Sequence, residues 1–354
     1  PNLLPTETWI PTPVNQPFRE ATRLQEHSPC SPQFSHRYAH IASSRRLELN
    51  LASSTRHVNS DRVKEPHAFL IGAPKAGTTW LANTLSQNPS ICLSDPKEPN
   101  IISSHKGTFS RSMTNPDWSE YFGLFKDEGI RLDGSIHAFS CPVSPIRIYE
   151  KFEKPKFILS LRQPVERTFS HWRMIIDTEE DKNWGEDWGD FKTAWDDSRL
   201  KEDSLYGKSL SRWLEYFDLS DFIIIDSNRL RESPEEALRE IGTFLELPLF
   251  DYNINPKAHS NSANRRRKMT ILGALFKSIF STIPRFLKAP VVKYLQSKDY
   301  NVYSMPLLSR RPESNKAFSL GPSHYSTCQE EVCEDLAKLQ KLTAFDTTEW
   351  IDAI

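Results

Sequence analysis

The stretch HAFLIGAPKAGTTWLANTL, residues 67–85, decides the fold class. It begins with a short apolar run that ends at Gly72, passes through a polar turn, and continues from Trp80 with apolar residues at helical spacing. This order predicts a strand, a loop and a helix. Backbone N–H groups and the helix dipole converge on such a loop, so we expect it to hold phosphate.

Two later segments repeat this order. KFILSLRQP, from residue 156, leads into VERTFSHWRM, and DFIIIDSNRL, from residue 221, precedes the helical pattern PEEALREIGTFLEL. Strands that alternate with helices predict an α/β fold, a P-loop-like, doubly wound parallel sheet flanked by helices. Two phosphate-binding turns would then meet at the carboxyl edge of the sheet, where α/β folds bind their ligands.

The loop departs from the P-loop pattern GxxxxGK[ST] at one position. Gly72 and Gly77 stand at the two glycine positions, and Thr79 stands at the hydroxyl position. Thr78, however, occupies the place of the lysine, and the lysine is Lys75, inside the loop. This arrangement is poorly suited to nucleotide triphosphate chemistry, in which the lysine steadies the β and γ phosphates. Lys75 can instead reach the oxygen that joins a phosphate to a transferred group.

The motif GAPKAGTTWL resembles the 5′-phosphosulfate loop of the sulfotransferases that use 3′-phosphoadenosine 5′-phosphosulfate (PAPS). The resemblance implies that the loop binds PAPS and its product, 3′,5′-adenosine bisphosphate, without a metal. Lys75 would stabilise the leaving phosphate oxygen, and Trp80 would stack on adenine, although a core position also explains this tryptophan. The expected ligand contacts come from Lys75, Ala76, Gly77, Thr78, Thr79 and Trp80.

LRQPVERTFSHW, which begins at residue 161, is similar to the 3′-phosphate motif of the same family. The resemblance implies that Arg162 and Ser170 bind the 3′-phosphate. The guanidinium is a natural fork for phosphate, and a hydroxyl one or two turns into the next helix can add a donor. Arg167 is explained by a helix-surface salt bridge as well as by ligand contact.

Sulfuryl transfer needs a group that removes a proton from the acceptor. SDPKEPNIIS, residues 94–103, resembles the region of heparan-sulfate-like and bacterial sulfotransferases whose glutamate acts as the base, which implies this role for Glu98. The family pattern places aromatic residues after the glutamate, whereas Asn100 and two isoleucines stand here. Cytosolic-type relatives use a histidine, so His105 and His137 stay as alternatives.

We expect a single sulfotransferase domain over residues 66–354. Residues 1–65 are rich in Pro, Ser, Asn and Arg and show no sustained apolar period, which predicts an extended or mobile arm.

The segment 265–298 is basic and amphipathic, with nine Lys or Arg and no acid. Its first residues, Arg265, Arg266 and Lys268, lie where several family members close a loop over the 3′-phosphate, and a solvated basic turn is the alternative. Residues 269–288 follow with an apolar helical face. This face either docks on its own domain or contacts a membrane surface or a partner.

The acceptor is expected to carry a hydroxyl or amine, on a carbohydrate or a small metabolite. The segment 177–203 holds 11 Asp or Glu against four Lys or Arg, together with three tryptophans. We expect a solvated helix and loop with the tryptophans packed beneath. If this segment lines the acceptor cleft, it repels a polyanionic glycan and favours a neutral or cationic acceptor. The basic amphipathic helix expected over residues 269–288 favours the opposite, an anionic or lipid-linked acceptor at a membrane surface, so both acceptor classes stay open.

Composition narrows the remaining classes. The chain has 38% hydrophobic and 26% charged residues, and no apolar run approaches the roughly 20 residues that cross a bilayer. A formal net charge of −1 with one short basic patch gives little support for nucleic-acid binding, and none is expected. Five cysteines without CxxC spacing favour a reducing cytoplasm over a zinc site or a disulfide framework, and the Golgi lumen stays open if an N-terminal anchor was removed.

Two other functions remain as alternatives. One is a P-loop nucleotide kinase, which predicts a need for Mg²⁺ and ATP. The other is a nucleotide-binding protein without transfer activity, which would keep the phosphate turns but need no chemistry from Lys75 or Glu98.

Overall fold

The computed structural model describes residues 62–254, 268–270, 272, 309–310 and 319–354. The arm expected over residues 1–65 lies outside the described residues as far as residue 61. Val63 already belongs to the folded domain, because it forms a parallel bridge with Phe152 and donates its N–H to the Lys151 carbonyl over 2.8 Å.

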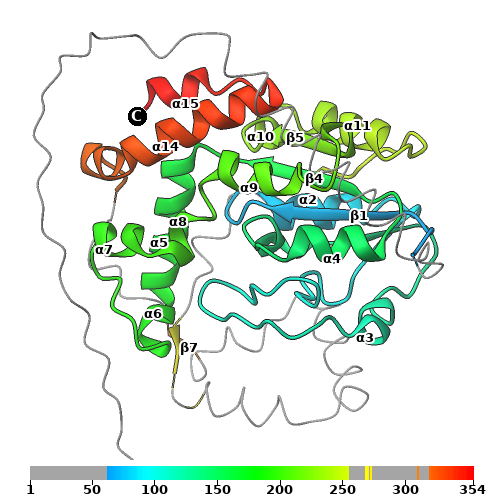
Figure 1. Cartoon of the computed structure of the whole chain (residues 1–354), viewed down its shortest axis with the longest axis horizontal. Coiled ribbons are helices and arrows are strands. Elements are labelled where there is room, and N and C mark those ends of the chain that lie inside the picture. The colour runs from blue at the N-terminus through cyan, green and yellow to red at the C-terminus, as the bar shows by residue number, and fades with distance from the viewer. Residues whose placement is uncertain (1–61, 255–267, 271, 273–308, 311–318) are drawn as a thin grey trace, which may run out of the picture.

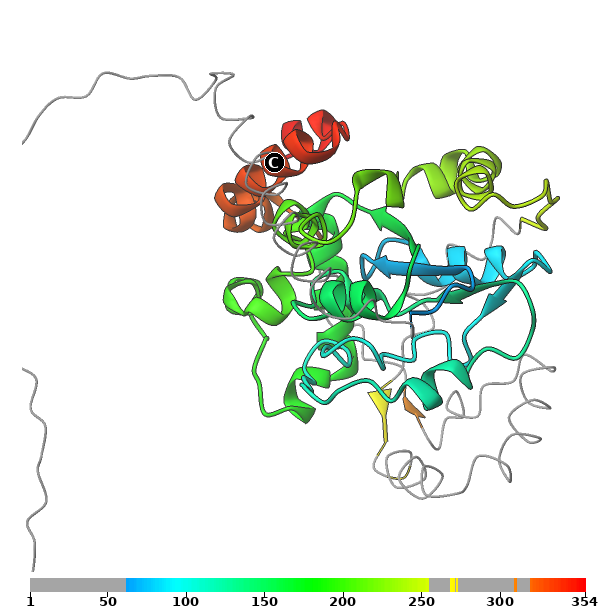
Figure 2. The same ribbon diagram turned by 45° about the vertical axis from the view of Figure 1, so that its right-hand side comes forward.

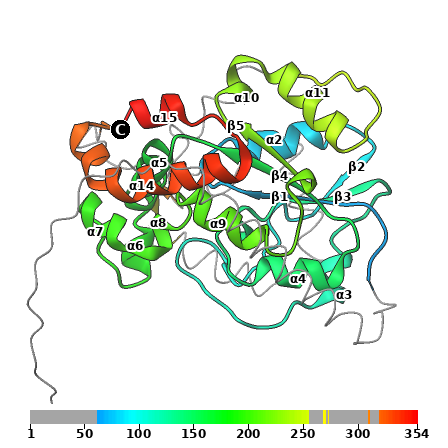
Figure 3. The same cartoon turned by 45° about the horizontal axis from the view of Figure 1, so that its top comes forward.

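The described part of the chain forms a central sheet of five parallel strands, β1 (His67–Gly72), β2 (Ile91–Leu93), β3 (Ile130–Asp133), β4 (Lys156–Leu161) and β5 (Phe222–Asp226). Their order in space is β2-β3-β1-β4-β5 (Figure 3). The chain winds first to one side of β1 and then, from β4, to the other side. The prediction of a doubly wound parallel sheet is confirmed, and the carboxyl end of β1 lies at the position where such sheets bind ligands.

The side chains of β1 point alternately into two cores. Ala68 and Leu70 belong to the core on one face of the sheet, and Phe69 and Ile71 belong to the core on the other. All four are buried. A strand covered on both faces is apolar at every position, which explains why AFLI shows no alternation of apolar and polar residues.

Helices α2 (Thr78–Leu85), α10 (Arg229–Glu232) and α11 (Pro234–Phe244) cover one face of the sheet (Figure 3). Leu81 and Leu85 of α2 share a core with Leu238 and Ile241 of α11. Proline at the first position of α11 and two glutamates in its first turn favour a helix start at this point. The predicted helices after the first and third strands are therefore confirmed.

The opposite core is built by α4 (Ser144–Lys151), α5 (Pro164–Thr178), α9 (Tyr206–Trp213), α14 (Pro322–Thr343) and α15 (Thr348–Asp352). Figures 1 and 2 show the red C-terminal helices beside the green helices of this group, and α14 contacts both α5 and α9. Asp335 of α14 accepts the N–H groups of Gly207 and Lys208, each over 2.7 Å, and so satisfies the N-terminus of α9. Trp350 of α15 is buried in the same core. The C-terminal helices therefore close this side of the core.

The remaining described α-helices and strands are α3 (Trp118–Phe122), α6 (Glu180–Asn183), α7 (Phe191–Asp196), α8 (Ser198–Lys201), β6 (Lys268–Met269) and β7 (Ser309–Arg310). β6 and β7 pair in antiparallel fashion. Within the described ranges, no helix combines the length and apolar character needed to cross a membrane.

Candidate active site at the carboxyl edge of the sheet

The loop between β1 and α2 ends in an open helix N-terminus. Gly77 is the N-cap residue, and its φ of 81° is a left-handed conformation that glycine adopts without strain. The first turn of α2, formed by Thr78, Thr79 and Trp80, has no side-chain cap and no acidic residue. Its N–H groups and the helix dipole are therefore suited to an anion.

Strand β4 holds this loop in place. Ala73 donates its N–H to the Ser160 carbonyl over 2.7 Å, and the Ser160 hydroxyl donates to the Ala76 carbonyl over 2.6 Å. Lys75 lies between these two anchors, half-buried and with a φ of 70°. Its Nζ is 3.5 Å from the Sδ atom of Met174 on α5. Lys75 is thus placed between the edge of the sheet and α5.

The three residues that open α2 differ in exposure. Thr78 is buried and Thr79 is exposed. Trp80 is half-buried and packs against the core beneath α11. Its packing accounts for part of the ring, and stacking on adenine stays a prediction.

The second motif directly follows β4. Arg162 is the first residue after the strand, and Ser170 is in the second turn of α5 and is half-buried. Nε and Nη2 of Arg162 lie 3.1 and 2.8 Å from Oε2 of Glu166, in a partly exposed ion pair. A phosphate at this turn would use the third guanidinium nitrogen or replace Glu166.

Glu98 lies in a turn that crosses the end of β3. Ser94 donates its N–H to the Leu132 carbonyl over 3.0 Å, and Gly134 donates its N–H to the Lys97 carbonyl over 3.1 Å. These bonds bring the turn after β2 to the carboxyl edge of the sheet, one strand away from β1. Glu98 and Lys75 therefore come from neighbouring loops of the same edge.

The surroundings of Glu98 are charged. Its Oε1 is 2.7 Å from Nζ of Lys97, and its side chain is 32% exposed. Asp133, the last residue of β3, is buried, and burial raises the pKa of its carboxyl group to about 6. Glu98 adds to this shift, while hydrogen bonds from Ser135 oppose it.

A buried polar cluster surrounds Asp203, whose side chain is 4% exposed. Oδ1 accepts a hydrogen bond from the Ser140 hydroxyl over 2.7 Å. Oδ2 lies 3.5 Å from Nδ1 of His137, 3.7 Å from Nη1 of Arg167 and 3.8 Å from Nδ1 of His171. Burial by itself would raise the pKa of Asp203, but these neighbours hold it well below its usual range.

Arg167 is part of this cluster and is completely buried. Its Nε donates to the Ser204 hydroxyl over 2.6 Å, and its Nη2 donates to the Leu200 carbonyl over 3.1 Å. The interpretation of Arg167 as a helix-surface salt bridge is therefore wrong. This face of α5 is covered by α8 and the turn that follows it, a packing that the local sequence does not reveal.

Both alternative histidines lie at the cluster. His137 is in a short 3₁₀ turn (Ile136–Ala138) after β3, with its Nδ1 facing Asp203. His105 is buried, and its Nδ1 is 3.4 Å from the Ser140 hydroxyl. Burial, followed by the charge of Arg111, lowers the pKa of His105 to about 4.

The acidic segment 177–203 is only partly as expected. Trp188 and Trp195 are buried, as predicted, but Trp184 is 53% exposed and stacks on Phe109 with their ring centroids 6.3 Å apart. The segment is also not solvated throughout, because Asp203 at its end is buried.

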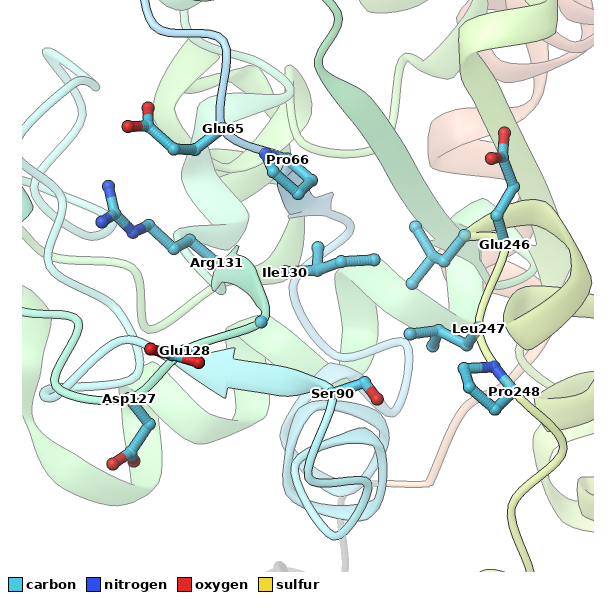
Figure 4. Close-up of a pocket in the computed structure, with 12 residues that line it drawn as sticks. Glu65, Pro66, Ser90, Asp127, Glu128, Ile130, Arg131, Glu246, Leu247 and Pro248 are labelled. Atoms are coloured by element: carbon cyan, nitrogen blue, oxygen red, sulfur yellow. The ribbon is translucent and has the colours of Figure 1, made fainter.

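A described pocket lies at the opposite, amino edge of the sheet (Figure 4). Its lining residues include those that precede or begin β1, β2 and β3, namely Pro66, Ser90 and Ile130. Its charged residues are Glu65, Asp127, Glu128, Arg131 and Glu246. A pocket with four acids and one arginine disfavours an anionic nucleotide, so we assign the candidate site to the carboxyl edge.

The proposed lid over the 3′-phosphate falls mostly outside the described residues. Arg265 and Arg266 are not described, and Lys268 is described only as backbone in β6. Of the amphipathic helix expected over residues 269–288, only positions 269, 270 and 272 are described.

The edge thus gathers the uncapped loop that carries Lys75, a second basic turn and a set of proton-carrying side chains on a doubly wound sheet. A family model described as a sulfotransferase domain matches residues 65–277, which is more than half of the chain. The chain belongs to the sulfotransferase family.

Two curated relatives of this sulfotransferase act in heparan sulfate modification according to their names. Heparan sulfate glucosamine 3-O-sulfotransferase 5 of Mus musculus is 27% identical over 207 residues, which cover 53% of this chain and 56% of the relative. The bifunctional heparan sulfate N-deacetylase/N-sulfotransferase 1 of Caenorhabditis elegans is 22% identical over 205 residues, which cover 55% of this chain and 24% of the relative. The chain spans about half the length of the first relative and about a quarter of the second.

A solved sulfotransferase from Alicyclobacillus acidocaldarius has the same fold. It superimposes with a TM-score of 0.53 at 18% identity and covers 81% of this chain and 99% of its own. The expected P-loop-like sulfotransferase fold is confirmed.

The sequence did not point to Asp203, His171 or Met174 as residues of the site. Asp203 is one acid among eleven in its segment, so its burial leaves no local signal. His171 and Met174 stand four and seven residues after Arg167, a spacing that places all three on one face of a helix. The sequence therefore predicts that these three residues share one face of a helix. It does not predict that this face packs against the turn that carries Asp203.

Proposed function

We propose that this sulfotransferase moves a sulfuryl group from PAPS to a hydroxyl or amine of an acceptor. The supporting observation is the loop between β1 and α2, where Lys75 lies within the loop and α2 begins without a side-chain cap. The open N–H groups fit the oxygens of a 5′-phosphate, and Lys75 can neutralise the charge that develops on the oxygen leaving sulfur.

The binding roles follow from the order of the strands. Ala76, Gly77, Thr78, Thr79 and Trp80 would hold the 5′ side of the nucleotide. Arg162 and Ser170, on the adjacent strand end and helix, would hold the 3′-phosphate. In this proposal Arg265, Arg266 and Lys268 close over that phosphate. A bisphosphorylated nucleotide matches two basic turns on neighbouring strands better than a triphosphate chain does.

Sulfuryl transfer requires the protein to position the reacting groups, and no covalent intermediate with the protein is needed. The acceptor must approach sulfur in line with the departing phosphate, lose a proton, and have the charge on the leaving oxygen stabilised. Lys75 is assigned to the leaving oxygen. Glu98 and the histidines of the Asp203 cluster are the candidates for the proton, and the reaction proposed here requires no metal.

The acceptor class is suggested by charge. The mouse and nematode relatives are named for heparan sulfate, whereas the segment 177–203 of this chain is strongly acidic. Asp177 and Glu179 stand at the end of α5, beyond Met174 and Lys75. An acceptor that passes over this end of α5 is expected to be neutral or cationic, a carbohydrate or small metabolite rather than a polyanion.

Calorimetric titration with 3′,5′-adenosine bisphosphate, with and without Mg²⁺, and with ATP in parallel, tests the proposal. We expect tight binding of the bisphosphate that does not depend on Mg²⁺. Binding of ATP only with Mg²⁺, and no binding of the bisphosphate, would replace the proposal with a nucleotide kinase. Bisphosphate binding without any turnover of [³⁵S]PAPS against an acceptor panel would favour a non-catalytic nucleotide-binding protein.

A further inference from the structure

The 3₁₀ turn that carries His137 lies directly against the phosphate loop. Phe139 donates its N–H to the carbonyl of Ile71, the residue before the loop begins, over 3.0 Å. A β-carbon on Gly72 would lie 3.3 Å from the Ile136 carbonyl oxygen and 3.0 Å from Cβ of Phe139. His137 is therefore positioned by the same strand end that positions the loop.

The cluster also reaches Lys75. His171 and Met174 are on neighbouring turns of α5, and Met174 contacts Nζ of Lys75. Burial, followed by the charge of Arg167, lowers the pKa of His171 well below its usual range, Asp203 opposes this shift, and Lys75 adds to it. The ring centroids of His171 and His137 are 6.2 Å apart. These contacts connect the cluster to the residue proposed to stabilise the leaving oxygen.

The histidines of the cluster differ in what their ring nitrogens can do. An arginine can only donate, so Nδ1 of His171 accepts from Arg167 over 3.1 Å, and its Nε2 donates to the Thr108 hydroxyl over 2.9 Å. Both nitrogens of His171 are therefore committed. The Ser140 hydroxyl donates to Asp203, so it can only accept from His105.

In His137, by contrast, one ring nitrogen has a lone pair that can accept a proton. Its Nδ1 lies 3.5 Å from Oδ2 of Asp203, and this buried oxygen accepts no other hydrogen bond among the described residues. In the neutral ring the proton therefore belongs on Nδ1, toward the carboxylate, and the lone pair is on Nε2. That Nε2 forms no hydrogen bond with the described residues, and the His137 side chain is 10% exposed. A base that faces a buried carboxylate with one nitrogen and keeps the other free of a hydrogen-bond partner is the arrangement that proton abstraction requires.

We propose that Asp203 is a positioning residue that holds His137 in the tautomer and orientation needed to accept the proton of the acceptor. The inference rests on the proposed sulfotransferase function and chooses between its candidate bases. Glu98 is the weaker candidate, because its carboxylate is paired with Lys97 and a third of its side chain is exposed. A paired carboxylate is a poorer base than an imidazole whose lone pair has no partner.

The proton and the electrons balance in one step. The acceptor oxygen forms a bond to sulfur while the bond between sulfur and the phosphate oxygen breaks. The proton of the acceptor passes to Nε2 of His137, and the electron pair of the broken bond stays on the phosphate oxygen beside Lys75. Asp203 keeps its charge and stabilises the imidazolium that forms.

Charged groups face Asp203 from several elements. Arg167 and His171 come from α5, His137 from the turn after β3, and His105 and Arg111 from the segment between β2 and α3. Arg167 balances the Asp203 carboxylate while both are buried. Replacement of Asp203 alone therefore leaves a buried guanidinium without its counter-charge.

The first test needs no acceptor. In protein labelled with ¹⁵N at histidine, ring ¹⁵N shifts report the tautomer of His137, and the His137→Gln variant identifies its signals. We expect the Nδ1–H tautomer in the native chain and a loss of that preference in Asp203→Asn. The Nε2–H tautomer in the native chain, or no change in Asp203→Asn, would overturn the inference.

The second test follows hydrolysis of [³⁵S]PAPS, with water as the acceptor. His137→Gln is expected to lower kcat by about 10²-fold or more with little change in KM for PAPS. Asp203→Asn is expected to lower kcat and to move the acid limb of the pH–rate profile to lower pH, because an amide no longer stabilises the imidazolium. The control is His67→Gln, which changes a buried histidine at the far end of β1 and is expected to keep the native rate.

If Asp203→Asn does not fold, the double variant Asp203→Asn/Arg167→Gln removes both buried charges and keeps the measurement possible. Full hydrolysis in His137→Gln together with loss in Glu98→Gln would assign the proton to Glu98 and leave the sulfotransferase proposal standing. Failure of the native chain to bind 3′,5′-adenosine bisphosphate would instead remove the proposed function, whatever the tautomer of His137.

Discussion

Tyr206 donates a hydrogen bond from its side-chain hydroxyl to the backbone carbonyl of Arg162, over 2.7 Å. Tyr206 opens α9 and is completely buried, whereas Arg162 directly follows β4 and begins the second basic turn. The bond therefore ties a helix 44 residues later in the chain to the proposed 3′-phosphate site. Asp335, which caps α9 from α14, extends this support to the C-terminal helix.

Removal of this hydroxyl tests the connection. Tyr206→Phe leaves the Arg162 carbonyl without its partner and is expected to lower the free energy of unfolding by about 1–3 kcal/mol. Affinity for 3′,5′-adenosine bisphosphate should fall as well, because the turn loses its support. Urea denaturation and calorimetry measure the two effects. Tyr325→Phe is the matched control, since Tyr325 is only half-buried, and it should change stability by no more than about 0.5 kcal/mol.

Substitution of Lys75 separates binding from chemistry. Lys75→Met keeps the alkyl chain beside Met174 but removes the charge proposed for the leaving oxygen. Transfer from [³⁵S]PAPS is expected to fall by about 10²–10³-fold, while affinity for 3′,5′-adenosine bisphosphate changes much less. Lys126→Ala, at an exposed lysine, serves as the control. A native transfer rate in Lys75→Met would show that another group stabilises the leaving oxygen.

The ion pair between Arg162 and Glu166 offers a test of the 3′-phosphate site. If phosphate competes with Glu166 for the guanidinium, Glu166→Gln should strengthen binding of 3′,5′-adenosine bisphosphate, whereas Arg162→Ala should weaken it by about tenfold or more. Binding of 5′-adenosine monophosphate, which lacks the 3′-phosphate, should respond to neither variant. Equal losses for both nucleotides in Arg162→Ala would place Arg162 in a structural role.

Buried histidines predict how stability depends on pH. Burial lowers the pKa of His67 to about 4, from an ordinary value of 6.5 in the unfolded chain. Between these values the unfolded chain binds a proton that the folded chain does not. The free energy of unfolding therefore falls as pH drops below 6.5, by up to about 1.4 kcal/mol per pH unit for each such histidine.

Urea denaturation at pH 7 and pH 5 measures this effect. His67→Phe removes one titrating group while keeping a ring among Phe122, Phe125 and Phe152. It should shrink the difference in stability between the two pH values by about 1–2 kcal/mol. An unchanged difference would mean that His67 is protonated in the folded chain.

Much of the site was predictable because its parts are local. Lys75, Arg162 and Ser170 were placed from two strand-loop-helix patterns, and a parallel sheet brings the carboxyl ends of its strands to one edge. The expected positions of these residues at that edge are confirmed by the strand order, whereas their contacts with a nucleotide stay predictions.

Which of Glu98 and His137 is the better candidate for the base was not predictable in the same way. Glu98 stood out by its resemblance to a motif, yet the structure pairs it with Lys97. His137 gained support only when the fold placed Asp203 beside it, 66 positions later in the sequence.

The sequence by itself determined the fold class and the positions of the loop between β1 and α2 and of the second basic turn. These depend on apolar periodicity and on glycine, lysine and arginine positions within a few residues of one another, which act through local backbone geometry. The tertiary structure decided which polar residues are buried together. The hydrogen bonds and the shifted pKa values of Arg167, His171 and Asp203 arise where α5, α8 and the loop after β3 pack together. Packing between segments that are distant in the sequence leaves no local sequence pattern.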